Sequence, residues 1–264
     1  MRRTTVAIAA GSLLLLTGCA SVSTATMSRG TPRDDVVTAA LATEQAGSAH
    51  VALDVRTLGS DPMALTIDGR LALDGSKADL TASVPSGGLG SGSGSASVHE
   101  IVVDGSTYLQ VRGIDLLPAV WVKADLGSGG ADTDNPLARL ATSAGVDDLL
   151  AALREVGTVQ KVARQEVGGV PTTKYHATLD ASSFLKDLPD LGGLDLGAVT
   201  GAAAVPVDLW VDDEGRLVQL QATVGSGDSG VRVTLGLADF GVPVAVTAPA
   251  ASLDLGSLLD GLGG

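Results

Sequence analysis

Hydrophobic and polar residues alternate with a period of two over most of the chain, beginning at His50. The first runs cover residues 50–56, 65–74 and 77–84, and Asp74-Gly75 favours a tight hairpin turn between the last two. Further runs cover residues 98–103, 107–112, 119–123, 158–167, 171–179, 205–212, 216–224 and 231–240. Because neighbouring side chains of a strand point to opposite faces, this pattern predicts an antiparallel sheet with one apolar and one polar face.

Three segments have the spacing or the boundary residues of helices instead. Thr31-Pro32-Arg33-Asp34 is a start signal, with a threonine cap, a proline at the first helical position and an acid three residues on. This first helix is expected to end at Gly47. A second helix follows residue 136 and runs to about residue 155, and a short third one covers residues 181–188.

These elements predict the α+β class, with ten or eleven strands in one antiparallel sheet and helices against one face. A single open sheet of so many strands has to curl, so we expect a strongly curved half-barrel with the helices on its concave side. Residues 85–97 form a low-complexity Gly/Ser loop, and no linker divides two cores. Residues 32–250 are therefore predicted to be a single domain, followed by a flexible tail at 251–264.

The N-terminus has the layout of a bacterial export signal. Arg2 and Arg3 precede an uncharged apolar stretch, residues 6–16, which is too short to span a bilayer as a helix. Leu16-Thr17-Gly18-Cys19 then resembles the bacterial lipobox, whose cysteine carries a thioether-linked diacylglyceryl group. We expect residues 1–18 to be cleaved, Cys19 to be lipidated and residues 19–31 to be a tether. The protein is then held at the extracytoplasmic face of the cell membrane.

Composition excludes several other classes of function. A net charge of −13 repels phosphate backbones, so nucleic acid is not an expected partner. Cys19 is the only cysteine, so once it is acylated none remains for a disulfide or a thiolate metal site. The three histidines, His50, His99 and His176, lack metal-ligand spacing and are interpreted as surface or edge residues. We expect neither a metal nor a cofactor.

Two motifs that could indicate catalysis have simpler explanations. Residues 225–230 match the G-x-G-x-x-G pattern, but they join two strand runs and so form a hairpin loop. The acidic runs Asp147-Asp148 and 212–214 lie at a helix start and at a turn, where the helix dipole and solvation favour them. No nucleophile elbow or P-loop is present. The sequence therefore predicts that the protein is not an enzyme.

From about Ser48 to Pro249 the chain resembles the LppX/LprAFG lipoproteins of actinobacteria. The segments that carry the resemblance are 48–51, 102–105 with Tyr108, the helix 149–156, the turn 168–170, 207–212 with Glu214-Gly215, and 240–244. The resemblance implies a large apolar cavity between a curved sheet and its helices, open to multi-chain lipids or lipoglycans. It thus implies a carrier that moves acylated ligands across the cell envelope, with a membrane lipid exporter as a further partner.

Alternation identifies the residues that would form the wall of such a cavity. The expected wall residues are Leu53, Val55, Ile67, Leu71, Leu149, Leu153, Leu209, Val211, Val233 and Leu235. The same apolar face would also suit a solid core. Two alternatives therefore stay open: a structural or interaction lipoprotein with a filled core, and a substrate-binding protein of a transporter. The sequence does not identify the lipid.

Overall fold

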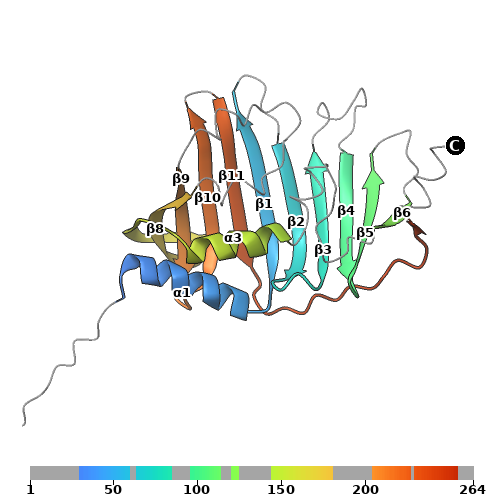
Figure 1. The fold of residues 1–264 in the computed structure, drawn as a ribbon, viewed down its shortest axis with the longest axis horizontal. Helices are drawn as coiled ribbons and strands as arrows, with labels where there is room; N and C mark the ends of the chain where they lie inside the picture. The colour runs from blue at the N-terminus through green and yellow to red at the C-terminus, as the bar shows by residue number, and fades with distance from the viewer. Residues whose placement is uncertain are drawn as a thin grey trace, which may run out of the picture.

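The computed structural model describes residues 30–59, 64–84, 96–113, 120–124, 144–180, 204–226 and 229–254. Within these ranges the chain is mostly β, with twelve strands in one sheet and two helices (Figure 1). The helices are α1 (Pro32–Gln45) and α3 (Ala144–Arg154). The strands are β1 (Ser48–Leu58), β2 (Ala64–Ala72), β3 (Ala78–Val84), β4 (Ala96–Val103), β5 (Ser106–Arg112), β6 (Trp121–Ala124), β7 (Val159–Val167), β8 (Val170–Asp180), β9 (Ala204–Asp212), β10 (Leu217–Ser226), β11 (Ser229–Ala238) and β12 (Leu253–Asp254).

The strand order across the sheet is β12-β6-β5-β4-β3-β2-β1-β11-β10-β9-β8-β7. Strands β1 to β11 pair antiparallel with their neighbours, which confirms the predicted antiparallel sheet. The short strand β12 pairs parallel with β6 and lies in the stretch that the sequence predicted as a flexible tail. The predicted helix at 181–188 lies outside the described residues.

The strong curl expected for this sheet is not found, and the half-barrel is corrected to an open sheet ending at β12 and β7 (Figure 1). Bulges are a main device by which strands bend a sheet. In the described ladders the register shifts only between Leu217 and Gln219 of β10 and between Lys161 and Ala163 of β7. The ladders from β6 across to β10 keep an unbroken register.

Both helices lie over one face of the sheet, here called the inner face, which on β1 carries Val51, Leu53 and Val55 (Figure 1). The opposite, outer face carries His50 and Asp54 on the same strand. Helix α1 packs against α3 and contacts β7 and β10. Apolar residues of both helices and of the inner face join in one buried cluster, so the prediction of helices on one face is confirmed.

The start of α1 follows its predicted capping signal. The Thr31 hydroxyl accepts a hydrogen bond from the backbone N–H of Asp34 at 3.3 Å, and the Asp34 carboxylate accepts one from the Thr31 N–H at 2.8 Å. The Thr31 hydroxyl also donates to this carboxylate at 2.9 Å, and the two hydrogen bonds that the carboxylate accepts from Thr31 hold the pKa of Asp34 below its ordinary value. This reciprocal pair of hydrogen bonds fixes the residue at which α1 begins, and therefore which of its residues face the sheet.

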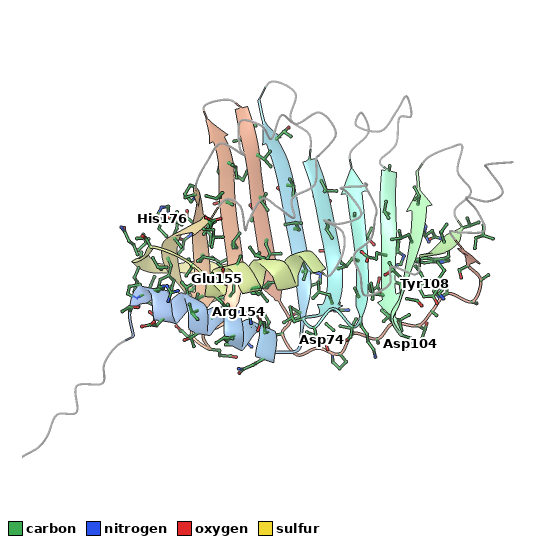
Figure 2. All side chains as sticks on the ribbon, in the orientation of Figure 1. Asp74, Asp104, Tyr108, Arg154, Glu155 and His176 are labelled. Carbon is green, nitrogen blue, oxygen red and sulfur yellow. The ribbon has the colours of Figure 1, made fainter. Side chains whose placement is uncertain are left out.

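Hydrogen bonds between distant parts of the chain then fasten α1 to the sheet and to α3. The Tyr175 hydroxyl of β8 donates to the Asp35 carboxylate at 2.9 Å. Burial, together with this hydrogen bond, raises the pKa of Tyr175 to about 12. Arg33 donates to the Val156 carbonyl at 2.8 Å, and Arg154, at the end of α3 in Figure 2, donates to Glu44 of α1 at 3.2 Å.

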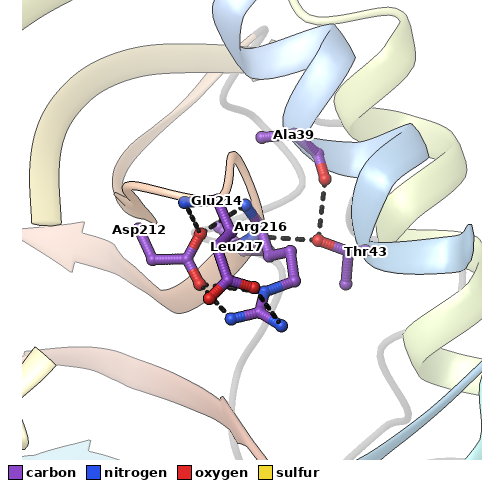
Figure 3. Close-up of polar contacts among 6 residues, drawn as sticks. All are labelled: Ala39, Thr43, Asp212, Glu214, Arg216 and Leu217. Carbon is purple, nitrogen blue, oxygen red and sulfur yellow. Dashed lines mark hydrogen bonds and ion pairs between the residues drawn. The ribbon is translucent and has the colours of Figure 1, made fainter. Parts of the chain in front are cut away.

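The β9–β10 turn is organised around one carboxylate (Figure 3). Asp212 accepts from the backbone N–H groups of Glu214 at 3.0 Å and Arg216 at 2.7 Å, and from the Arg216 guanidinium at 2.8 and 2.9 Å. Beside this turn, the Thr43 hydroxyl of α1 accepts from the Leu217 N–H at 2.8 Å and donates to the Ala39 carbonyl at 2.7 Å. Solvation does not explain Asp212, because this residue is buried; its carboxylate instead stabilises the turn through these hydrogen bonds.

Candidate ligand-binding face

The inner face presents aligned apolar rows that run from strand to strand. Leu53 of β1 pairs with Leu235 of β11 on one side and with Ile67 of β2 on the other. The same row continues through Leu209, Leu220, Ala82 and Val98. Because residues directly opposite each other have Cβ atoms about 5 Å apart, the side chains of such a row touch across the strands. The result is a continuous apolar layer rather than separate patches.

All ten residues predicted as cavity wall lie in this layer or on the helix that covers it. Eight are buried, namely Val55, Ile67, Leu71, Leu153, Leu209, Val211, Val233 and Leu235. Leu53 and Leu149 are half-buried and pack against the same cluster. Alternation thus placed the eight strand residues on the apolar face, and helical spacing placed Leu149 and Leu153 on the helix side that packs against it. Their role as a ligand-contacting wall stays a prediction, because burial alone describes a packed layer.

The described helices do not cover the whole inner face. They lie over the part of the sheet from β8 to β2, whereas β3 to β6 extend beyond them (Figure 1). On that extension the inner-face residues Ala78, Leu80 and Ala82 of β3 are buried, whereas those further out are half-buried, namely Val98, Val102, Leu109 and Val122. Among the described residues, this extension is therefore where an apolar inner surface has no helix packed on it.

One acidic residue lies within the apolar rows of this extension. Glu100 of β4 stands directly opposite Leu80 of β3 and Leu109 of β5, and only 1% of its surface is exposed. Neither oxygen of its carboxyl group has a hydrogen-bond partner in the described part of the chain. Burial raises the pKa of Glu100 from its ordinary value of 4.5 to about 8, so the group is held in its neutral form at neutral pH.

Sequence analysis did not single out Glu100, although a signal was present. Val98 and Val102 flank it at the same phase of the strand, so strict alternation places the glutamate on the apolar side. A charged residue at an inward position is unusual and costly unless it is paired or serves a function.

On the outer face, each of the three histidines lies beside an aspartate. His50 lies 3.4 Å from Asp68 and His99 2.7 Å from Asp79. His176 is 2.9 Å from Asp208, which also binds Lys174 at 2.9 Å. Partial burial raises the pKa of Asp208, but the hydrogen bonds from Lys174 and His176 outweigh it and lower the pKa overall. The interpretation of the histidines as surface or edge residues is therefore confirmed.

Two other features of the outer face bear on ligand binding. A polar groove of about 420 Å³ lies between β1–β3 and residues 243–246, and it is lined by His50, Asp68, Arg70, Asp79 and Thr81.

Trp210 of β9 points to the outer face, as its phase in the strand predicts. Its side chain is nevertheless only 4% exposed, and the Lys174 ammonium lies 4.9 Å from its ring centre. Charged and polar groups thus dominate the outer face, which leaves the inner face as the apolar one.

The remaining site prediction, lipidation of Cys19, lies outside the described residues. Within the described ranges, no cluster of three or more histidine, cysteine, aspartate or glutamate side chains is arranged to hold a metal ion. The two described helices are both too short or too polar to cross a bilayer.

Comparison with known proteins places the chain in a family. Residues 31–246 match the LppX_LprAFG lipoprotein family, and the chain belongs to it. The chain is 33% identical over 153 residues to the lipoarabinomannan carrier protein LprG of Mycolicibacterium hassiacum, a match that covers 57% of this chain and 56% of that protein. Its matches span about half the length of the curated relatives. Membership of a lipoprotein family implies a lipid-anchored location in the envelope.

Solved structures give the same result for the fold. LprF from Mycobacterium bovis superimposes with a TM-score of 0.52 at 20% identity, covering 83% of this chain and 97% of that one. LppX from Mycobacterium tuberculosis gives a TM-score of 0.50 at 21% identity, covering 82% and 98%. The sheet with its helices on one face is therefore the fold of this family.

Proposed function

We propose that this protein is a carrier that binds the acyl chains of a lipid or lipoglycan against the inner face and moves them across the cell envelope. Cys19 would anchor it by a diacylglyceryl group at the extracytoplasmic face of the cell membrane. The observation that carries the proposal is the continuous apolar inner face, whose extension over β3 to β6 has no described helix on it. Acyl chains are the ligands that such a surface recognises, since burying apolar area is its main source of affinity.

Two further observations support a carrier over the alternatives. A relative in the same family is named for carrying lipoarabinomannan, a lipoglycan. The described residues form one antiparallel sheet, not the pair of α/β lobes expected of a transporter substrate-binding protein. No reaction is proposed, and the partners are the acylated ligand, the membrane through Cys19, and an exporter that would load the ligand.

The direct test identifies the ligand that the protein carries and then reduces the space for that ligand at the inner face. Organic extracts of the purified full chain are analysed by mass spectrometry for acylated lipids. Leu53→Trp fills space next to a half-buried wall position, so it should lower the amount of co-purified lipid with little loss of stability. Ala52→Trp is the matched control, because Ala52 is exposed on the outer face of the same strand.

A filled core predicts the opposite result. Overpacking a solid core costs about 1–3 kcal/mol in unfolding free energy. If Leu53→Trp and the more deeply buried Leu71→Trp, Leu153→Trp and Leu235→Trp all destabilise the fold by that amount, and the unaltered protein yields no lipid, the protein is a structural or interaction lipoprotein.

A further inference from the structure

The buried carboxyl group of Glu100 has no structural explanation within the described chain. Its neighbours across the strands are Leu80 and Leu109, and its same-face neighbours along β4 are Val98 and Val102. The diagonal positions on β3 and β5 are Ala78, Ala82, Thr107 and Val111, so none of these facing groups carries a charge. If this glutamate only filled space, leucine at the same position would make the folded protein more stable, because burying an unpaired polar group costs free energy.

Asp212 is the instructive contrast. It is also buried, but four hydrogen bonds from Glu214 and Arg216 satisfy its two oxygens. Glu100 accepts none from the described residues, although its side chain stands on the face proposed to receive the ligand.

We propose that the Glu100 carboxyl is the hydrogen-bonding anchor of the ligand site and pairs with an uncharged oxygen group, a hydroxyl or an ester, that joins the acyl chains to their head. This inference rests on the proposed function and adds which chemical group of the carried ligand the protein recognises. A neutral carboxyl group both donates through its O–H and accepts through its C=O, so a glycerol backbone with ester and hydroxyl oxygens matches it. An anionic phosphate does not, because the described inner-face residues of β3, β4 and β5 around Glu100 include no cation; Arg112 of β5 and His99 of β4 lie at the opposite phase of their strands.

The test compares two uncharged ligands on the purified full chain, by displacement of an uncharged fluorescent hydrophobic probe. Dioctanoylglycerol has hydroxyl and ester oxygens, whereas hexadecane has only hydrocarbon. Glu100→Leu should weaken dioctanoylglycerol binding on the order of tenfold, the worth of one buried hydrogen bond, and should leave hexadecane binding within about twofold. Glu100→Gln keeps a donor and an acceptor and should lose much less affinity than Glu100→Leu.

Controls separate this inference from the proposed function. Glu166→Leu, on the exposed strand β7, reports any general effect of replacing a glutamate by leucine. Thermal unfolding should find Glu100→Leu at least as stable as the unaltered protein, so a loss of binding is not a loss of fold. Equal dioctanoylglycerol binding by Glu100→Leu and the unaltered protein would overturn the anchor and leave acyl-chain binding intact. If Glu100→Gln and Glu100→Leu lose equal affinity for dioctanoylglycerol, the inference that the partner is an uncharged oxygen group is wrong. If the unaltered protein binds neither ligand, both this inference and the proposed function are wrong.

Discussion

The side-chain hydroxyl of Thr43, on α1, accepts a hydrogen bond from the backbone N–H of Leu217, the first residue of β10, at 2.8 Å (Figure 3). The two residues are 174 positions apart, and Thr43 is fully buried. One hydroxyl thus fastens the helix to the sheet at the point where β10 begins.

Thr43→Val should lower the free energy of unfolding by about 1–3 kcal/mol, because it leaves the buried Leu217 N–H without a partner while the side-chain volume stays similar. Chemical denaturation followed by circular dichroism measures the change. Thr43→Ser keeps the hydroxyl and is the matched control. Equal stability of Thr43→Val and the unaltered protein would mean that the bond contributes nothing net.

Gly69 of β2 is predicted to be the least replaceable glycine of the central strands. Its φ is +153°, and an added Cβ would lie 2.0 Å from the Asp79 carbonyl oxygen of β3. Gly69→Ala should therefore cost at least about 2 kcal/mol, since strand β3 has to move away. Gly236→Ala is the control, because the nearest atom to its added Cβ is the Ala52 oxygen at 3.7 Å. Similar melting temperatures for the two variants would contradict the close approach of β2 and β3.

Glu100 predicts a pH dependence of stability with a definite sign. Its pKa is about 8 in the folded protein and near 4.5 when exposed, so the folded state binds the proton more tightly. The stabilising contribution is complete below about pH 4.5 and is lost as the pH rises through 8. Relative to Glu100→Gln, the unaltered protein should lose at most about 1.4 kcal/mol per pH unit across this window. Urea denaturation at pH 5, 6, 7 and 8 measures the difference, and parallel curves for the two proteins would refute it.

Anchoring gives a prediction that is independent of the sheet. Cys19→Ala should abolish incorporation of a labelled fatty acid, because no other residue of the chain can form the thioether. The variant should remain as an uncleaved precursor or leave the membrane fraction. Cell fractionation with metabolic labelling distinguishes these outcomes, and label that persists in the variant would refute the lipobox interpretation.

Much of the fold could be predicted because its signals are local. The period of two marked all eleven antiparallel strands of the described chain. Asp74-Gly75 and residues 168–170 marked tight turns, in which Gly75, Gly168 and Gly169 have positive φ angles in the structure. The capping box at Thr31 depends on residues only three positions apart. The expected curl of the sheet was wrong, since curvature depends on bulges that the alternation pattern does not reveal.

The sequence by itself therefore determined which residues form strands and which side of each strand is apolar. The expected inner-face residues from Leu53 to Leu235 all lie in or against the buried apolar cluster. Only the tertiary structure decided which strands are neighbours and which polar groups find partners. Trp210 is out of phase with Leu209 and Val211 and so faces outward, yet it is buried. Asp212 and Glu100 are both buried acids in β-strands, but of these two only Asp212 accepts hydrogen bonds from the described residues. Alternation is a property of single strands, whereas burial and hydrogen bonding depend on residues brought together from distant parts of the chain.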